Sequence, residues 1–271
     1  MYVVTKEMVQ NKVDDIFYLT YGKLDNNCKQ NSFVNYNLIP IVGEIHLLEP
    51  SDMMVCMKRI NKSLMLKKAL DDLNEKWKEL GLPVVVIKGD TLQRVYPEGV
   101  RRIYKDIDIV VSSQVYNDFM TMMEKEGFLV KMSGELISPT TVSMNYFQEI
   151  KNHIVLMRDE VKVEAHCKFL DSERFPMVNN QEIYSRCIYN NSFQRYEIED
   201  NDYFIYLLSH FYKHYTNETI KKHRYNEDVV FPLNKLFDIW FWIESNKANL
   251  NYEIIKQRIV TWKLVCCIID K

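Results

Sequence analysis

Apolar residues recur at helical spacing in the stretch from Asp52 to Leu80. The positions that share this spacing are Met53, Met57, Ile60, Leu64, Leu70, Leu73, Trp77 and Leu80. A recurrence every three or four residues predicts an α-helix with one apolar face. Ser51 or Asp52 can cap its start, and Gly81 followed by Pro83 marks its end. We therefore expect one long helix over 52–80.

The sequence before this helix has a weaker pattern. Two short helices are expected, around Lys6–Leu19 and Val42–Leu48, with polar, Asn-rich sequence between them. Together with the long helix they make an N-terminal helical region over 1–81.

Between residues 82 and 175 the pattern changes to short apolar or alternating runs, which are typical of strands. The expected strands are Val84–Lys88, Asp106–Ser112, Phe128–Lys131, Asn152–Met157 and Val161–Phe169. The last two flank the turn Arg158-Asp159-Glu160 and predict a β-hairpin. Short helices are expected over Asp90–Tyr96 and Val115–Glu126, because Pro97 and Gly127 follow them.

From about residue 180 onward the spacing is helical again. Helices are expected over Tyr203–Tyr215, Asn234–Ser245 and about Tyr252–Ile269, which gives a C-terminal helical region over 176–271. The whole chain is therefore expected to have an α/β (α+β) fold, with a small mixed sheet over 82–175 flanked by N- and C-terminal helices.

Composition narrows the class of partner. The chain has 35 Lys and Arg against 37 Asp and Glu, for a net charge of −2. Proteins that bind nucleic acid usually carry a basic face, so a small molecule, a peptide or a protein is favoured as substrate, although a local basic groove is not excluded.

The six cysteines include no CxxC pair. No secretory pattern and no apolar run of about 20 residues appears, so a cytoplasmic protein without a membrane partner is expected.

The run Asp106-Ile107-Asp108 is the sharpest chemical signal. In a strand, residues i and i+2 point to the same face, so two carboxylates emerge side by side and Ile107 packs on the other face. Two like charges repel unless a cation lies between them. Mg²⁺ prefers one or two carboxylates together with phosphate oxygens and water. The alternative is an ordinary solvent-facing strand of alternating polarity.

Residues on two other expected strands extend this signal. Gly89 ends one strand where a helix begins, and it lets a backbone approach a phosphate closely, while Lys88 adds a positive charge. Glu164, in the run Lys-Val-Glu-Ala-His, could complete a site of three carboxylates. Alternatively, Glu164 is an ordinary strand residue that faces outward.

Together these residues carry a family resemblance. The run VIKGDTLQRVYPEGVRRIYKDIDIVV resembles the signature of the bacterial uncharacterised nucleotidyltransferase family, which lies within the polymerase-beta-like nucleotidyltransferase superfamily. The later run VEAHCKF is similar to its acidic–apolar–His strand. The similarity covers roughly residues 52–245, and six elements of the central motif fall in order.

The resemblance implies a nucleotidyltransferase core and a role for each matching residue. Asp106 and Asp108 are then metal ligands for Mg²⁺ or Mn²⁺, and Glu164 is the third catalytic acid and metal ligand. Gly89 becomes the turn near the phosphates, and Arg102 a triphosphate contact or a packing residue. Lys88, as the cation beside Gly89, is expected to help bind the nucleotide.

Two residues depart from the family pattern. Asp90 stands where a small residue or Ser usually contacts phosphate, and Lys105 directly precedes the acidic pair. A carboxylate at position 90 would repel a triphosphate unless it caps the helix that follows.

The implied reaction moves a nucleoside monophosphate from a nucleoside triphosphate such as ATP to an acceptor hydroxyl. Phosphoryl transfer needs charge neutralisation and positioning more than covalent help. A small molecule, peptide or protein acceptor is favoured over an RNA end. Two alternatives remain: a non-catalytic nucleotide-binding module, and a toxin-like transferase acting on tRNA, which would need a basic groove.

Three histidines and one aspartate require separate explanations. His210 and His214 lie at i and i+4 of a predicted helix, so both project from one face. We expect them to form a buried, hydrogen-bonded pair; the alternative is a contact with substrate, for His214 in particular. His166 shares the strand face of Glu164 and contacts substrate or hydrogen-bonds beside the site. Asp238 lies in the apolar stretch LFDIWFWI and needs a buried His or Arg partner on a neighbouring helix.

Two further runs have ordinary explanations. Trp240, Trp242 and Trp262 are expected in the core. Lys221-Lys222-His223-Arg224 is expected to be a solvated face, with a phosphate-binding loop as the alternative.

Overall fold

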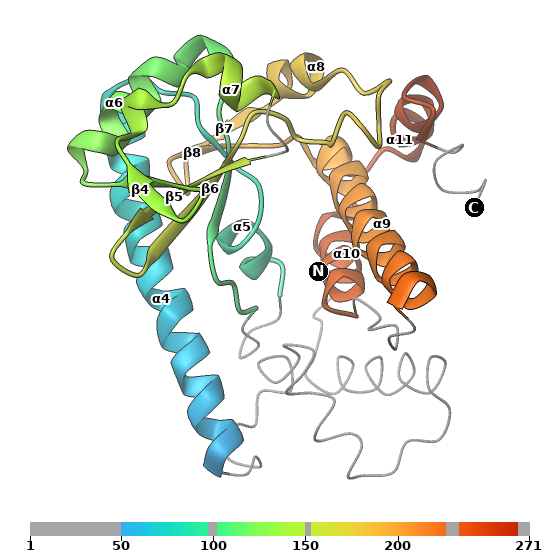
Figure 1. Ribbon diagram of the computed structural model, residues 1–271. Helices are drawn as coiled ribbons and strands as arrows, with labels where there is room; N and C mark the ends of the chain where they lie inside the picture. The colour runs from blue at the N-terminus through green and yellow to red at the C-terminus, as the bar shows by residue number, and fades with distance from the viewer. Residues whose placement is uncertain (1–49, 97–101, 150–152, 226–232, 265–271) are drawn as a thin grey trace.

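The computed structural model describes residues 50–96, 102–149, 153–225 and 233–264 (Figure 1). The short helices expected around Lys6–Leu19 and Val42–Leu48 lie outside these residues, as do the side chains of the run 221–224. In chain order the helices and strands are α4 (Pro50–Glu79), β1 (Val85–Val86), α5 (Asp90–Gln93), β2 (Ile107–Val110), α6 (Tyr116–Lys125), β3 (Leu129–Met132), β4 (Glu135–Ile137), α7 (Met144–Glu149), β5 (His153–Arg158), β6 (Val161–His166), α8 (Asn180–Ser185), β7 (Ile188–Asn190), β8 (Arg195–Glu197), α9 (Asp200–Tyr225), α10 (Leu233–Asn246) and α11 (Tyr252–Thr261).

One mixed sheet of eight strands organises the described part of the chain. Its strand order is β4-β3-β5-β6-β2-β1-β8-β7. β2 runs parallel to β6, and β1 runs parallel to β8, while the remaining neighbours are antiparallel. The expected α/β (α+β) class with a mixed sheet is therefore confirmed.

The two faces of this sheet pack against different helices. Ile107, Ile109 and Val111 belong to one apolar core with Leu70 of α4 and the buried residues of α6. Val110 belongs to a second core, with α9, α10 and α11. Because side chains alternate along a strand, one short apolar strand contributes to both cores. Figure 1 shows α4 on one side of the sheet, with α9 and α10 on the other.

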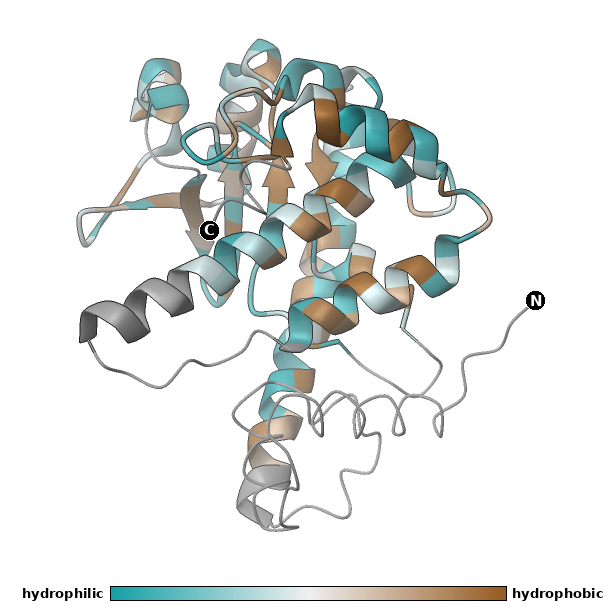
Figure 2. Cartoon of the chain, turned by 90° about the vertical axis from the view of Figure 1, so that its right-hand side faces the viewer, coloured by the Kyte–Doolittle hydropathy of each residue, from teal (hydrophilic) through white to brown (hydrophobic). Residues whose placement is uncertain are grey.

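The hydropathy of the residues differs between the sheet and the helices around it. The strands at the centre of the sheet are largely apolar, whereas the surrounding helices alternate apolar and polar bands (Figure 2). Among the described residues, no helix combines the length and the apolar character needed to cross a bilayer.

Two expectations about the C-terminal region are wrong. The chain after residue 180 is not purely helical, because β7 and β8 form a hairpin whose inner strand pairs with β1. The helix expected over Tyr252–Ile269 ends at Thr261, where the backbone turns and Lys263 adopts a φ of 51°. Such a left-handed residue does not continue an α-helix.

Candidate active site

Polar side chains of β2 and β6 gather on the sheet face that is directed toward α9. The odd-numbered residues of both strands fill the core against α4, so alternation directs the even-numbered ones to the opposite face. Asp108 and Glu164 are register partners in the parallel pair β2–β6, and Val110 pairs with His166. Two carboxylates from strands far apart in sequence therefore lie side by side.

Asp108 is the most enclosed acid of this group. It is only 6% exposed, and its Oδ1 accepts a hydrogen bond from Lys88 Nζ at 2.8 Å. The Nε2 atom of His166 lies 3.4 Å from the same oxygen. Burial alone would raise the pKa of Asp108, but the Lys88 ammonium and the His166 contact outweigh it and hold that pKa well below its ordinary value. Asp108 is therefore a carboxylate at neutral pH.

Asp106 and Glu164 share one lysine. Lys162 Nζ donates to Asp106 Oδ2 at 3.2 Å and also to Glu164 Oε1. Burial, together with the charges of Asp108 and Glu164, raises the pKa of Asp106. Both observations place Asp106, Asp108 and Glu164 close enough to influence one another, and we refer to them below as the acidic trio.

A cavity of about 200 Å³ adjoins the acidic trio, between the sheet and α9. Its lining includes Lys88, Lys168 and Lys213 against only two acids, Glu164 and Asp171. Lys88 is paired with Asp108, so the attraction of this cavity for an anion depends mainly on Lys168 and Lys213.

The α9 wall of this cavity comes from one helix face. Tyr206, His210 and Lys213 follow one another at spacings of four and three residues, and all of them line the cavity. His214 Nε2 lies 3.1 Å from His210 Nε2, so the expected hydrogen bond is present, although both residues are half-buried rather than buried. Loss of hydration and the nearby Lys88 charge lower the pKa of His210 well below its ordinary value. His210 is therefore neutral at pH 7.

The comparisons with known proteins identify the family. Residues 56–268 match the model of the family described as uncharacterised nucleotidyltransferase. The chain belongs to this family. No curated protein and no solved structure matches it. Because the matched range runs from α4 to beyond α11, the acidic trio and the cavity both lie within the nucleotidyltransferase domain, and the chain has a general nucleotidyltransferase role.

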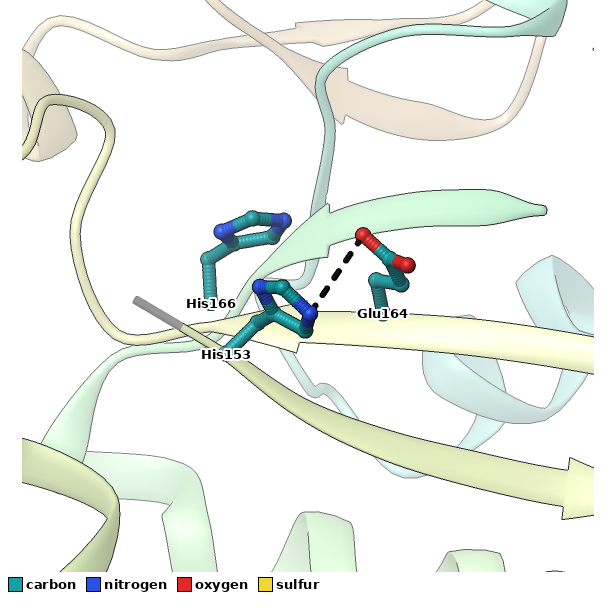
Figure 3. A group of neighbouring side chains, drawn as sticks. All are labelled: His153, Glu164 and His166. Atoms are coloured by element: carbon teal, nitrogen blue, oxygen red, sulfur yellow. Dashed lines mark ion pairs between the residues drawn. The ribbon is translucent and has the colours of Figure 1, made fainter. Parts of the chain in front are cut away.

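One histidine beside the acidic trio was not singled out from the sequence. His153 of β5 is the register partner of His166 in β6, and its Nε2 lies 3.7 Å from Glu164 Oε2. Figure 3 shows the three side chains rising from neighbouring strands toward one another. The predicted hairpin would not have given this pairing, because a turn over 158–160 places residue 153 opposite residue 165. In the structure Arg158 pairs with Val161, so the turn is one residue shorter and residue 153 lies opposite residue 166.

Arg102 is turned away from the cavity, toward α10. Its Nε and Nη2 donate to the two carboxylate oxygens of Asp238 at 2.6 and 2.9 Å. Tyr96 also donates to Asp238, at 2.7 Å. These contacts support the packing role rather than the triphosphate role for Arg102. Asp238 has the Arg partner that was expected, although Arg102 lies in the segment before β2 and not on a helix.

Asp90 does not act as the helix cap that the sequence suggested. The N-terminal cap position of α5 is Gly89, with no side-chain capping bond, and Asp90 is buried within the first turn. Its carboxylate instead accepts a hydrogen bond from Arg195 Nη1 of β8 at 2.8 Å. Arg195 is almost fully buried as well, so it neutralises Asp90 locally. The expected repulsion of a triphosphate by Asp90 is therefore largely cancelled.

Gly89 has a steric reason to be glycine. Its φ is 59°, and a Cβ placed there would lie 3.2 Å from the ring of Tyr104. Any other residue would combine left-handed backbone strain with a close contact. The phosphate contact of Gly89 remains a prediction.

Proposed function

We propose that this chain is a metal-dependent nucleotidyltransferase that moves a nucleoside monophosphate from a nucleoside triphosphate, such as ATP, to an acceptor hydroxyl. The observation that carries this proposal is the register pairing of Asp108 with Glu164 beside a lysine-lined cavity. Carboxylates next to ammonium groups offer both a cation site and a polyanion site in one place.

The chemistry of the acidic trio fits a divalent ion. Its three carboxylates face two ammonium groups, Lys88 and Lys162, which leaves one negative charge in excess. Carboxylate oxygens are the protein ligands that Mg²⁺ and Mn²⁺ prefer, so Asp106, Asp108 and Glu164 would hold the ions. When bound, such ions neutralise charge on the attacking and leaving oxygens of the transfer.

The chain's own side chains would bind the phosphates, orient the acids and accept a proton. Lys88, Lys168 and Lys213 are placed to bind the phosphates of the triphosphate, and Gly89 lies next to Lys88. His166 orients Asp108 through the contact at 3.4 Å, and His214 supports His210 on the α9 wall. Glu164 lines the cavity and is the acid placed to accept the proton of the acceptor hydroxyl.

The chemical class of the acceptor is proposed from the net charge of the chain. A net charge of −2 favours a small molecule, a peptide or a protein over a nucleic acid. A labelling experiment with whole cell extract identifies the class directly, because a labelled RNA end would separate from labelled protein or small molecules by size and nuclease sensitivity.

A second candidate function is nucleotide binding without transfer. The observation that favours it is the pairing of Lys88 with Asp108 and of Lys162 with the other two acids, which neutralises two of the three negative charges without an ion. A binding module would be stabilised by triphosphate yet label no acceptor.

The first test concerns the ion and the nucleotide. Mg²⁺ with triphosphate should raise the thermal stability of the wild type, by about 2.7 kcal/mol when the ligand is at a hundred times its Kd. Asp106→Asn combined with Asp108→Asn should remove that increase and leave the protein folded. Asp171→Asn, which changes another acid of the same cavity, should retain it. A stabilisation that survives the double substitution would place the nucleotide elsewhere.

A further inference from the structure

We propose that His153, Glu164 and His166 bind one divalent transition-metal ion through two imidazole nitrogens and one carboxylate oxygen (Figure 3). The acidic trio alone is suited to Mg²⁺. The histidines beside it define a different kind of site, which shares only Glu164 with the trio.

The geometry brings three donor atoms together. One ligand atom from each side chain lies within 4.8 Å of the other two, and His153 Nε2 lies 3.7 Å from Glu164 Oε2. Donors held about 2.0–2.1 Å from a tetrahedral Zn²⁺ are about 3.4 Å apart. Small side-chain rotations on two rigid, hydrogen-bonded strands are therefore enough to close the site.

Strand pairing explains why the donors converge. His153 and His166 are directly opposite one another in the antiparallel pair β5–β6, and their ring centroids are 5.0 Å apart. Glu164 is two residues before His166, so it lies on the same face of β6. Lys162 bonds to Glu164 Oε1, while Oε2 is the oxygen directed toward His153.

The donor set selects the class of ion. Two imidazoles and one carboxylate suit Zn²⁺, Fe²⁺, Co²⁺ and Ni²⁺, whereas Mg²⁺ prefers ligand sets made of oxygen alone. Three protein ligands also leave coordination positions open, as in catalytic rather than structural metal sites. All three side chains line the cavity, so those positions are directed toward bound substrate.

As a statement about catalysis this inference rests on the proposed function, because it identifies the ion that Glu164 holds on the acceptor side. As a statement about binding it stands alone. Its test therefore uses the metal without nucleotide.

The experiment is a titration of the metal-free full chain with Co²⁺, followed by visible absorption, with Zn²⁺ added as competitor. The wild type should bind one Co²⁺ with the spectrum of a nitrogen- and oxygen-ligated site, and Zn²⁺ should displace it. His153→Gln should weaken binding at least tenfold. That side chain is 34% exposed, so the variant should fold, which a thermal melt checks. His214→Gln, which removes an imidazole from the same cavity, should leave Co²⁺ affinity unchanged.

The outcomes separate this site from the proposed function. Asp106→Asn should lose stabilisation by Mg²⁺ and triphosphate but keep its Co²⁺ affinity. Absence of Co²⁺ binding in the wild type would overturn the metal site, and stabilisation by Mg²⁺ with triphosphate would still support the transfer reaction. Loss of Co²⁺ binding in His214→Gln but not in His153→Gln would also overturn it, since the ion would then lie on α9.

Discussion

Glu164 differs from the two aspartates in where its carboxylate is directed. It lines the cavity, whereas Asp108 is enclosed by Lys88 and His166 and Asp106 contacts Lys162. An acid that faces the cavity can reach a bound acceptor. Asp108, which is enclosed, can hold an ion in position but lies farther from the cavity. This difference predicts that substitutions within the trio affect binding and chemistry unequally.

Substituting Glu164 by Gln should separate the two effects. Triphosphate binding should be nearly unchanged, because the lysines proposed to bind phosphate and the aspartate pair remain. Transfer should fall by roughly a hundredfold or more, which corresponds to the loss of about 3 kcal/mol of transition-state stabilisation. Nucleotide affinity from calorimetry and single-turnover transfer rates measure the two quantities. Equal transfer rates for the variant and the wild type would remove Glu164 from the mechanism.

The sequence could predict the directions of individual side chains but few of their partners. Strand alternation is local, so it correctly directed Ile107 into the core and Asp108 to the opposite face. The partner of Asp90 is 105 residues away, on a strand that was not predicted. Such a contact depends on the order of strands in the sheet, which periodicity along the chain does not encode.

At the scale of elements, long helices were predictable and short edge strands were not. α4 and α10 each extend over several turns. Of the apolar face expected for α4, Leu70, Leu73 and Trp77 are buried, whereas Met57, Leu64 and Leu80 are exposed. β7 and β8 have three residues each, and their side chains alternate too briefly to give a period-two signal. They become strands because β1 offers an edge to pair with, which is tertiary context that overrides the local pattern.

The buried pair of Arg102 and Asp238 should be essential for attaching α10 to the sheet. Asp238→Ala leaves the Arg102 guanidinium without its buried partner and should cost about 3–5 kcal/mol of unfolding free energy, measured by urea denaturation. Arg102→Met combined with Asp238→Leu removes both charges and should recover much of that loss. A single variant within 1 kcal/mol of wild type, on the scale of an exposed pair, would contradict this account.

Glu199 connects the start of α9 to α11. Its Oε2 accepts hydrogen bonds from Arg258 Nη1 at 2.6 Å and from the backbone nitrogen of Asp202 at 3.2 Å. Burial would raise the pKa of Glu199, but these bonds outweigh it and lower that pKa below its ordinary value of 4.5. A depressed carboxyl pKa contributes stability above the ordinary value, and this contribution is lost as the pH falls through the folded-state pKa.

Glu199→Gln should therefore lower the melting temperature at neutral pH. The difference from wild type should shrink as the pH falls below 4.5. Comparing the two proteins at each pH cancels the titration of their other acids, including Asp202, whose pKa burial raises. A melting-temperature difference that stays constant from neutral to acidic pH would show that Glu199 acts through packing rather than charge.

At the scale of the whole molecule, the proposed function depends on bringing three separate segments to one cavity. β1 with its following turn supplies Lys88, the β5–β6 hairpin supplies His153 and Glu164, and α9 supplies Lys213. The overall charge of −2 does not reveal this arrangement, because it does not show where acids and lysines meet. Each segment could be assigned from sequence, but their convergence requires the folded sheet.

The most direct measurement of the central claim is label transfer. The wild type is incubated with cell extract, Mg²⁺ and each nucleoside triphosphate labelled on its α-phosphate, beside the variant that carries both Asp106→Asn and Asp108→Asn. The account predicts that the wild type attaches labelled nucleoside monophosphate to one class of acceptor, and that the folded double variant attaches none. Equal labelling by both proteins would contradict it. Nucleotide binding by the wild type without any labelled acceptor would favour the binding module instead.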